Sequence, residues 1–447
     1  MDELKKQMKE FGDKLYYSFF RHRMDNTGLT KSKIMFSNVL LHIQPVKIHK
    51  RSVKFKTTMG LGLITFYLFL LLATTGILLM FHYVPSTAIG PDGLPDAYSR
   101  MVNLRSNVFW GDFLRNMHRW SAHGMVAFVA LHMLRVYLAG AHRGGREFNW
   151  VIGCILGLLT VFLSYTGYLL PWDQLAFWGV KVGTEIAKIA PGGALIRAVL
   201  LGDTDVGAEA LIRFYVLHVA VLPSVMGFLI AVHFFRIRKD GGLARPADTS
   251  KEKQIPDEEF GEVKNNSVFK SARSYKLVEI VKGNEPKVNE EVDQMMFAWP
   301  KLIVREVMVF AGLMVVMSLI SVFFDAPLEG PADPNHPTNP AKAPWYFLGL
   351  QELTSYDGFI GGVVIPGILA GGVMFLPYIE IFLETFTKTY RKNIPGVWFA
   401  RERWIENALF IGMYLFMLTL IIIGVYFRGE NWAIAYPWVE QAAGGGH

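Results

Sequence analysis

Four histidines lie inside long apolar stretches of this 447-residue chain. His118 and His132 are fourteen positions apart in one stretch, and His218 and His233 are fifteen apart in another. At 100° per residue, fourteen residues fall about 40° short of four full turns, so His118 and His132 share one helix face about 21 Å apart along its axis. An imidazole buried in hydrocarbon is costly unless it has a partner or a function.

Two helices that each carry a histidine near either end can clamp two flat macrocycles stacked across a bilayer. In parallel helices His118 is level with His218, and His132 with His233. Each pair fills both axial positions of a six-coordinate iron, which suits electron transfer, so we expect two haem groups. For any single histidine an interhelical hydrogen bond is the alternative. His123 points about 140° away from His118, and we assign it no cofactor role.

Other residues in these stretches could accommodate such cofactors. Glycines let a macrocycle edge approach the backbone, although close helix packing explains them equally well. They recur at a fourteen-residue spacing: Gly62 and Gly76, and Gly153 and Gly167. Arginines within about one turn of the histidines could neutralise haem propionates, or else extend to lipid headgroups. They are Arg115, Arg119 and Arg135.

The composition predicts an integral membrane protein. The chain is 52% hydrophobic and only 19% charged, which is too apolar for an ordinary soluble domain. About twenty apolar residues cross the hydrocarbon core as a helix. We expect an all-α membrane protein with seven transmembrane helices, near residues 58–82, 113–139, 150–170, 213–236, 302–324, 360–385 and 404–427.

The spans divide into four and then three, with polar segments around them. We expect a four-helix di-haem domain over 55–240 and a three-helix domain over 301–430. Residues 241–300 form a polar linker with few aromatic residues, and 431–447 form a tail. The N-terminal segment 1–54 begins by alternating charged residues with Leu, Met and Phe, which predicts an amphipathic surface helix.

The positive charges indicate the orientation. Basic loops carry Arg143 and Arg146 in one place and Arg401 and Arg403 in another, whereas the long segment 325–359 has only Lys342. By the positive-inside rule the basic loops, the linker and the N-terminus face the cytoplasm of a bacterial-type inner membrane. The net charge of +7 thus reflects membrane topology and contact with lipid, and we expect no nucleic-acid partner.

Cysteine is almost absent. Cys154 is the one cysteine in the sequence. A single thiol cannot hold an iron–sulfur cluster or supply the two-cysteine attachment of a c-type haem. Any iron–sulfur centre that works with this chain must belong to another subunit.

Several motifs resemble one family. "LRNMHRWSAHG", "ALHMLRVYLAG", "TGYLLPWDQLAFWGVK", "RFYVLHVAVLP" and "VHFFRIRKDG" are similar to the cytochrome b subunit of Rieske-type quinol oxidoreductases. The fifteen-residue histidine spacing and "PWDQ" resemble the photosynthetic form, in which a four-helix haem protein and a three-helix subunit are separate chains. Here both are joined. The resemblance is strong over about 55–245 and looser over 297–428.

The resemblance implies a bifurcated reaction. Quinol is oxidised near the positive side, at a site that includes Trp172, Pro344, Trp345 and Tyr346. One electron goes to a Rieske iron–sulfur protein, and the other passes through the two b haems to a quinone near the cytoplasmic side, where Arg236 is expected. The partners implied are the Rieske protein, a c-type cytochrome and a second copy of the chain in a homodimer, and the reaction contributes to proton translocation.

Two departures from the family pattern stand out. The usual Pro-Glu-Trp-Tyr motif reads Ala343-Pro344-Trp345-Tyr346, so its proton-accepting glutamate is missing. Glu352, eight residues after Pro344, is the substitute we consider, and a paired carboxylate in the bundle is its alternative role. Gly60 stands where the photosynthetic form attaches an extra haem through cysteine, so no covalently attached haem is expected.

Two other protein classes remain. A di-haem membrane anchor of another quinone-linked dehydrogenase would explain the histidines, but not "GYLLPWDQ" or the three-helix half with "APWYF". A non-redox transporter with intramembrane histidines would bind no haem. A reduced-minus-oxidised visible spectrum separates these classes.

Overall fold

The computed structural model describes residues 27–37, 44–239, 295–387 and 397–438, together with residues 3, 5–9, 11 and 12. Most of the expected N-terminal amphipathic helix lies outside these residues. So do residues 240–294 of the polar linker and most of the tail.

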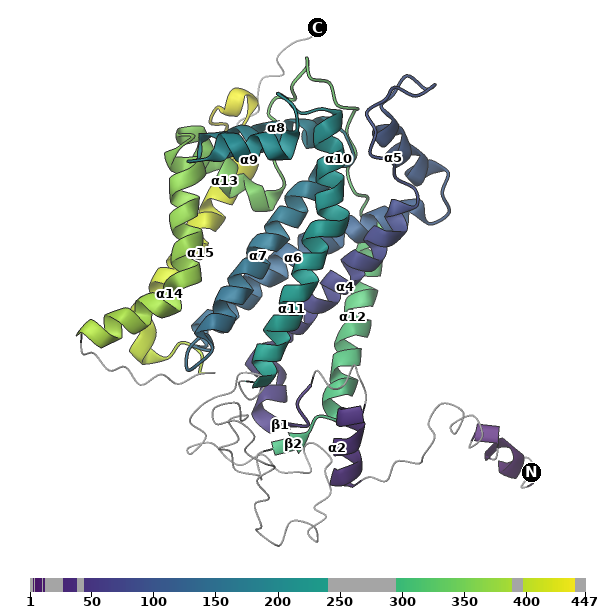
Figure 1. The fold of residues 1–447 in the computed structure, drawn as a ribbon, viewed down its shortest axis with the longest axis vertical. Helices are drawn as coiled ribbons and strands as arrows, with labels where there is room; N and C mark the ends of the chain where they lie inside the picture. Colours follow the sequence, from purple (N-terminus) through teal and green to yellow (C-terminus); the bar gives the residue numbers. More distant parts are fainter. Residues whose placement is uncertain are drawn as a thin grey trace.

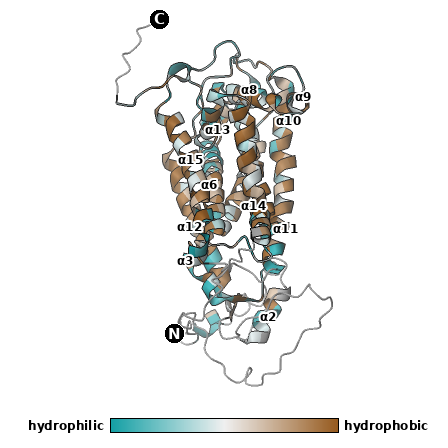
Figure 2. Ribbon diagram, turned by 90° about the vertical axis from the view of Figure 1, so that its left-hand side faces the viewer, coloured by the Kyte–Doolittle hydropathy of each residue, from teal (hydrophilic) through white to brown (hydrophobic). Residues whose placement is uncertain are grey.

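The described residues contain seven helices that are long and apolar enough to cross a membrane, as the sequence predicts. Their lengths match the hydrocarbon core, in which a helix satisfies its own backbone hydrogen bonds. Figure 2 shows hydrophobic residues along these helices and hydrophilic ones near their ends. The spans are Leu61–Met80 (α4), Gly111–Leu138 (α6), Glu147–Tyr168 (α7), Ala208–Lys239 (α10, η3 and α11), Lys301–Phe323 (α12), Ile360–Leu383 (η6 and most of α14) and Arg401–Tyr426 (η7 and α15).

The first four spans form a bundle, and the last three pack around it (Figure 1). Helix α6 packs along α4 and contacts α7, while α7 packs along α11. Helix α12 lies against α4 and α6, α14 against α7, and α15 against α6. The chain therefore folds as a four-helix bundle with a three-helix addition.

Short elements mark the two ends of the bundle (Figure 1). One end, called here the α8 end, carries the helices Asp96–Ser106 (α5), Gln174–Ile189 (α8), Gly193–Leu201 (α9) and Trp345–Tyr356 (α13), with the turn Glu430–Trp432 (η8). The other, called the β1 end, carries Gly28–Ser37 (α2), Lys47–His49 (β1), Lys50–Val53 (η2), Phe55–Thr58 (α3) and Met295–Phe297 (β2).

Strands β1 and β2 join the beginnings of the two halves. They pair antiparallel, with Ile48 opposite Met296. Both side chains are buried in a small apolar cluster with Met35, Ala298 and Leu302. The segment before α4 and the segment before α12 are thus held together outside the helical bundle.

Two spans contain a single π-helical turn. One is Leu217–Val221 (η3), between Ala208–Val216 (α10) and Leu222–Lys239 (α11); the other is Ile360–Val364 (η6), before Ile365–Thr387 (α14). At η3 the N–H of Leu222 donates to the carbonyl of Leu217, five residues back. Pro223 follows and has no backbone N–H. A regular α-helix would therefore lack one hydrogen bond here in any case, so an irregular turn loses less than it would elsewhere.

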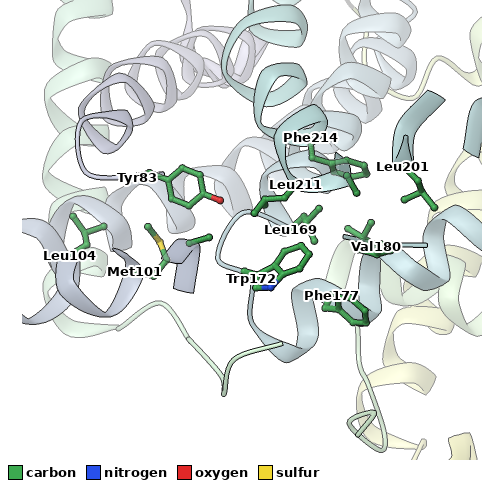
Figure 3. Packing of buried hydrophobic residues seen from close by; sticks show 13 residues of the cluster. Tyr83, Met101, Leu104, Leu169, Trp172, Phe177, Val180, Leu201, Leu211 and Phe214 are labelled. Atoms are coloured by element: carbon green, nitrogen blue, oxygen red, sulfur yellow. The ribbon is translucent and has the colours of Figure 1, made fainter. Parts of the chain in front are cut away.

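The largest apolar cluster lies at the α8 end (Figure 3). It joins Tyr83, after α4, to Trp172 and Phe177 around the start of α8, and to Leu211 and Phe214 of α10. The Tyr83 hydroxyl donates to the Leu170 carbonyl over 2.7 Å. This packing fixes the turn after α7, which contains Trp172, one of the residues expected at the quinol site.

Candidate functional site

His118 and His218 face each other between α6 and η3. Their ring centroids are 6.2 Å apart, and the ring planes are inclined by 76°. Bonds from imidazole nitrogen to a metal are about 2.0 Å long. The gap between the rings is therefore of the size that one metal atom bonded to both would occupy.

Hydrogen bonds fix the tautomer of both rings. Thr75 Oγ1 donates to the Leu71 carbonyl at 2.8 Å, so it accepts from His118 Nδ1 at 2.9 Å. On the other side, the Leu163 carbonyl lies 3.1 Å from His218 Nδ1 and accepts from it, with Thr166 Oγ1 at 3.2 Å. With Nδ1 protonated, each Nε2 keeps its lone pair for a metal.

The second pair, His132 and His233, lines a cavity of about 730 Å³ toward the β1 end. Their Nδ1 atoms are buried and have no hydrogen-bond partner in the described part of the chain, although the Asn149 backbone lies beside His233. Buried polar atoms normally have partners, and unpartnered ones often mark a missing ligand. This pair and its cavity have the room and the nitrogen atoms to hold a planar metal complex.

The π-helical turn η3 accounts for the unequal histidine spacings. His118 and His132 are fourteen residues apart in α6, which has no such turn, whereas His218 and His233 are fifteen apart across η3. A turn with five-residue hydrogen bonds takes up one residue more than an α turn. The extra residue is thus absorbed, and both helices present histidines at matching levels.

The four glycines lie against the four histidines. A methyl group at Gly167 would lie 2.5 Å from Cε1 of His218, and one at Gly62 would lie 3.0 Å from Cε1 of His132. At Gly76 and Gly153 the corresponding distances are 3.3 Å to His118 and 3.7 Å to His233. A side chain at Gly167 or Gly62 would displace the neighbouring histidine ring, so these positions of α7 and α4 require glycine.

The three arginines have different surroundings. Arg115 is buried and donates to the carbonyls of Ala326 and Pro327, each over 2.6 Å. Arg119 donates to His123 Nε2 over 3.1 Å and stacks on Tyr168. Arg135 donates to the Thr57 carbonyl and is the one of these three that lines the 730 Å³ cavity.

The residues of the expected quinol site cluster in part. Pro344 precedes the first turn of α13, and Trp345 and Tyr346 begin that helix. Trp345 Nε1 donates to His123 Nδ1 over 3.1 Å, and the Tyr346 ring lies edge-on to the His123 ring at 5.4 Å. Trp172 is instead buried in the apolar cluster of Figure 3, with φ at +53° in the turn after α7.

Glu352 has the paired role, the alternative that the sequence leaves open. It is fully buried in α13 and binds Arg428, Tyr356 and Trp432. Burial alone would raise its pKa, but the hydrogen bonds from these three residues hold the pKa of Glu352 below its usual value. The geometry therefore gives no support to Glu352 as a proton acceptor.

Arg236 lies beside the 730 Å³ cavity rather than in its lining. Its guanidinium stacks over the Phe148 ring at 5.6 Å. Arg238, two residues later, lines the cavity together with His132 and His233. Sequence reasoning passed over Arg238, because both residues belong to one basic run after the apolar stretch and only their helical direction separates them.

A buried ionic cluster joins the two halves toward the β1 end, and sequence reasoning did not find it. Glu380 of α14 contacts His142 Nε2 at 3.1 Å and accepts from the Tyr137 hydroxyl at 3.0 Å. Arg143 and Arg403 each lie 3.5 Å from its carboxylate. Two arginines that the sequence assigns to membrane topology are therefore also structural partners of a buried carboxylate.

Across the described ranges, no three of His, Cys, Asp and Glu gather as a metal site. The metal-ligand candidates are the two histidine pairs. They lie in helices long and apolar enough to cross a membrane, which places the chain in the class of helical integral membrane proteins.

Comparisons with known proteins specify the class further. The family described as "Cytochrome b(N-terminal)/b6/petB" matches residues 123–331. The cytochrome b6 of Heliomicrobium gestii is 41% identical over 199 residues, which are 44% of this chain and 88% of that protein. The cytochrome b6 of Chlamydomonas reinhardtii is 40% identical over 182 residues, or 40% of this chain and 81% of that protein.

A solved structure described as "Hyperthermophilic respiratory Complex III" has the same fold, with a TM-score of 0.64 and 21% identity over 88% of both chains. The chain belongs to the cytochrome b family of Rieske/cytochrome b complexes. Membership implies haem b as the cofactor.

Proposed function

We propose that this chain is the di-haem cytochrome b subunit of a quinol oxidoreductase. His118 and His218 hold one haem, and His132 and His233 hold the other. The observation that carries the proposal is the pair His118 and His218, whose ring centroids are 6.2 Å apart and whose Nδ1 atoms each donate a hydrogen bond, which leaves each Nε2 lone pair for a metal. When bound, haem supplies one-electron transfer between the two ends of the bundle.

The chain positions these groups and excludes water from them. Thr75 and Thr166 orient His118 and His218, whose haem is called here the outer haem; the haem of His132 and His233 is the inner haem. The glycines of α4 and α7 leave room for the histidine rings beside the backbone. Arg135, close to His132, supplies positive charge for a propionate. We assign the α8 end to the positive side of the membrane and the β1 end, with the N-terminus, to the cytoplasmic side, following the distribution of basic loops.

Quinol oxidation belongs at the α8 end, where Pro344, Trp345 and Tyr346 begin α13. Quinone reduction belongs near the β1 end, beside Arg236 and Arg238, because the cavity between His132 and His233 is assigned to the haem. The electron acceptors would be a Rieske iron–sulfur protein and a c-type cytochrome, within a complex that contains two copies of this chain. The functional units are 55–240 for the haems and 301–430 for the quinol site, joined by 241–300.

Purification of the native complex tests this function. A dithionite-reduced minus oxidised spectrum should show b-type α-bands from two haems for each chain, and added quinol should reduce both when an oxidant for the iron–sulfur partner is present. A spectrum without haem would exclude the proposal. Two haems that quinol cannot reduce would favour a di-haem anchor of another enzyme.

A further inference from the structure

The missing motif glutamate leaves the quinol site without its usual proton acceptor. Glu352 does not replace it, since both of its oxygens are bound by Arg428 and one also by Trp432. Asp325, in the loop before α13, is engaged by Asn116 and Arg105. The side chain that the fold does bring to Trp345 and Tyr346 is His123.

His123 contacts three residues toward the α8 end: Arg119, Trp345 and Tyr346. Its Nδ1 is 3.1 Å from the indole Nε1 of Trp345, and its Nε2 is 3.1 Å from Nε of Arg119. The Tyr346 ring packs edge-on against it at 5.4 Å. It is five residues after His118 on α6, which places it about 7.5 Å from His118 along the helix axis.

The two nitrogens of His123 both face donors. Indole Nε1 and guanidinium Nε can only donate, whereas a neutral imidazole carries one N–H and one lone pair. One of the two contacts therefore sets an N–H against another N–H. In the tautomer with its lone pair on Nδ1 the ring accepts from the indole, and a ligand hydroxyl that took the place of the indole could donate to the same atom.

An apolar cavity of about 580 Å³ adjoins this position. His123, Trp120 and Trp345 line it, and the other lining residues lie in α4, α6 and α12 and are all uncharged. Such a lining suits a planar aromatic ring with an apolar tail, and it leaves His123 as the titratable group on the cavity wall.

We infer that His123 accepts one of the two protons of quinol, in place of the missing carboxylate; this rests on the proposed function. A quinol O–H bond breaks and an N–H bond forms on the imidazole, which gives an imidazolium. The other proton would go to water or to the iron–sulfur partner, and the two electrons would go one to that partner and one to the haem held by His118 and His218.

The charges around His123 determine what happens to the proton. Arg119 on the same helix is the charged group that contacts the ring, and Tyr346 from α13 is the titratable one; Tyr168 at the end of α7 lies under Arg119. The α12 residues that line the cavity are apolar. The positive charge of Arg119 opposes a second charge on the imidazole and stabilises the quinol anion, so the proton is passed on rather than retained.

The test uses the purified complex and two probes, decylubiquinol and 2,3-dimethyl-1,4-naphthoquinol. The rate of outer-haem reduction is measured by stopped flow from about pH 5 to about pH 9, around the usual range of histidine. His123→Gln should slow reduction by about 10²-fold or more and abolish its acid limb, because general base catalysis contributes factors of this size. His336→Gln, which changes an exposed histidine in the loop before α13, is the control and should leave both unchanged.

A rescue variant gives the second readout. His123→Glu restores a carboxylate beside Trp345, so reduction should recover in part and the acid limb of its pH profile should shift from that of the wild type. Haem content, measured in the dithionite-reduced spectrum, should stay as in the wild type. The dissociation constant for oxidised 2,3-dimethyl-1,4-naphthoquinone should change by about tenfold or less.

The outcomes separate the two proposals. A wild-type complex without two haems, or one that quinol does not reduce, would refute the proposed function whatever His123 does. A wild-type complex that oxidises quinol, with His123→Gln unchanged in rate and pH profile, would refute the role of His123 alone. Should His123→Gln lose haem, an unshifted acid limb in His123→Glu would overturn the inference.

Discussion

Both oxygens of the Glu352 carboxylate are held by Arg428: Nη2 lies 2.5 Å from Oε1, and Nε lies 3.0 Å from Oε2. Tyr356 and Trp432 donate further hydrogen bonds of 2.8 and 3.0 Å. The pair fastens α13 to the segment that follows α15. It thereby fixes the helix that presents Trp345 and Tyr346 at the proposed quinol site.

The first prediction is that Glu352→Gln destabilises the complex without abolishing quinol oxidation. Removing one charge from a buried ion pair costs about 3–5 kcal/mol, because the other charge is left buried. The pKa of Glu352 is held below its usual value, so the pair stabilises fully above the unfolded pKa of about 4.3 and is lost as pH falls through the folded pKa.

Thermal unfolding of the complex as a function of pH checks this prediction. The melting temperature should drop in acid for the wild type and less so for Glu352→Gln, with Arg428→Lys as the conservative control. An unchanged melting temperature together with collapsed turnover would instead restore Glu352 as a proton acceptor.

The second prediction concerns the histidine pairs. His118→Ala and His218→Ala should remove the same haem, and His132→Ala and His233→Ala the other. Each loss would be read from the α-band that disappears in the reduced-minus-oxidised spectrum and from its midpoint potential. Loss of one spectral component in both His118→Ala and His132→Ala would show that the pairing is wrong.

The third prediction separates haem accommodation from helix packing at the glycines. A methyl group at Gly153 would meet Cε1 of His233 at 3.7 Å, an ordinary contact that does not displace the ring. If a haem edge lies against this backbone, the added methyl group of Gly153→Ala should overpack the site at a cost of about 1–3 kcal/mol. The variant should then contain less of the haem held by His132 and His233. Gly412→Ala, with nothing within 4 Å, is the matched control. Full haem content in Gly153→Ala would leave helix packing as the reason for the glycine.

The fourth prediction concerns the buried cluster around Glu380. Glu380→Gln leaves Arg143 and Arg403 beside a neutral amide, so it should cost about 3–5 kcal/mol and lower the melting temperature. Asp96→Asn breaks an exposed pair with Arg100 and should cost about 1 kcal/mol or less. Equal effects of the two variants would mean that the Glu380 cluster contributes no more than a surface pair.

The fifth prediction distinguishes the two arginines after His233. Arg238 lines the inner cavity, whereas Arg236 lies over Phe148. Arg238→Gln should slow reoxidation of the inner haem by about tenfold or more, the scale of one charged hydrogen bond, and leave its reduction by quinol intact. Arg236→Gln is the comparison. A slower reoxidation in Arg236→Gln than in Arg238→Gln would favour the original sequence expectation.

The spans could be predicted from sequence because hydrocarbon thickness sets their length. The expected span 150–170 corresponds to Glu147–Tyr168, and 302–324 to Lys301–Phe323. The spacings of fourteen and fifteen residues predicted that the two histidines of each helix lie on one face, because both spacings are close to four helical turns. The π-helical turn at His218 could not be anticipated, although Pro223 nearby was a local signal for an irregular helix.

The candidate site was less predictable, because its contacts join residues far apart in the chain. His123 and Trp345 are 222 residues apart, and no periodicity links them. Helical geometry correctly separated His123 from His118, but it could not show which element lies on the other side. Arg403 illustrates the same limit: a basic loop residue in the sequence is a partner of buried Glu380 in the fold.

The strand pair β1–β2 also bears on how the two halves assemble. Because these strands pair the segment before α4 with the segment before α12, the two halves touch outside the bundle as well as within it. Covalent continuity raises the effective concentration of one half for the other and fixes their stoichiometry at one to one. A protease site inserted into 240–294 should therefore yield, after cleavage, two polypeptides that still migrate as one complex.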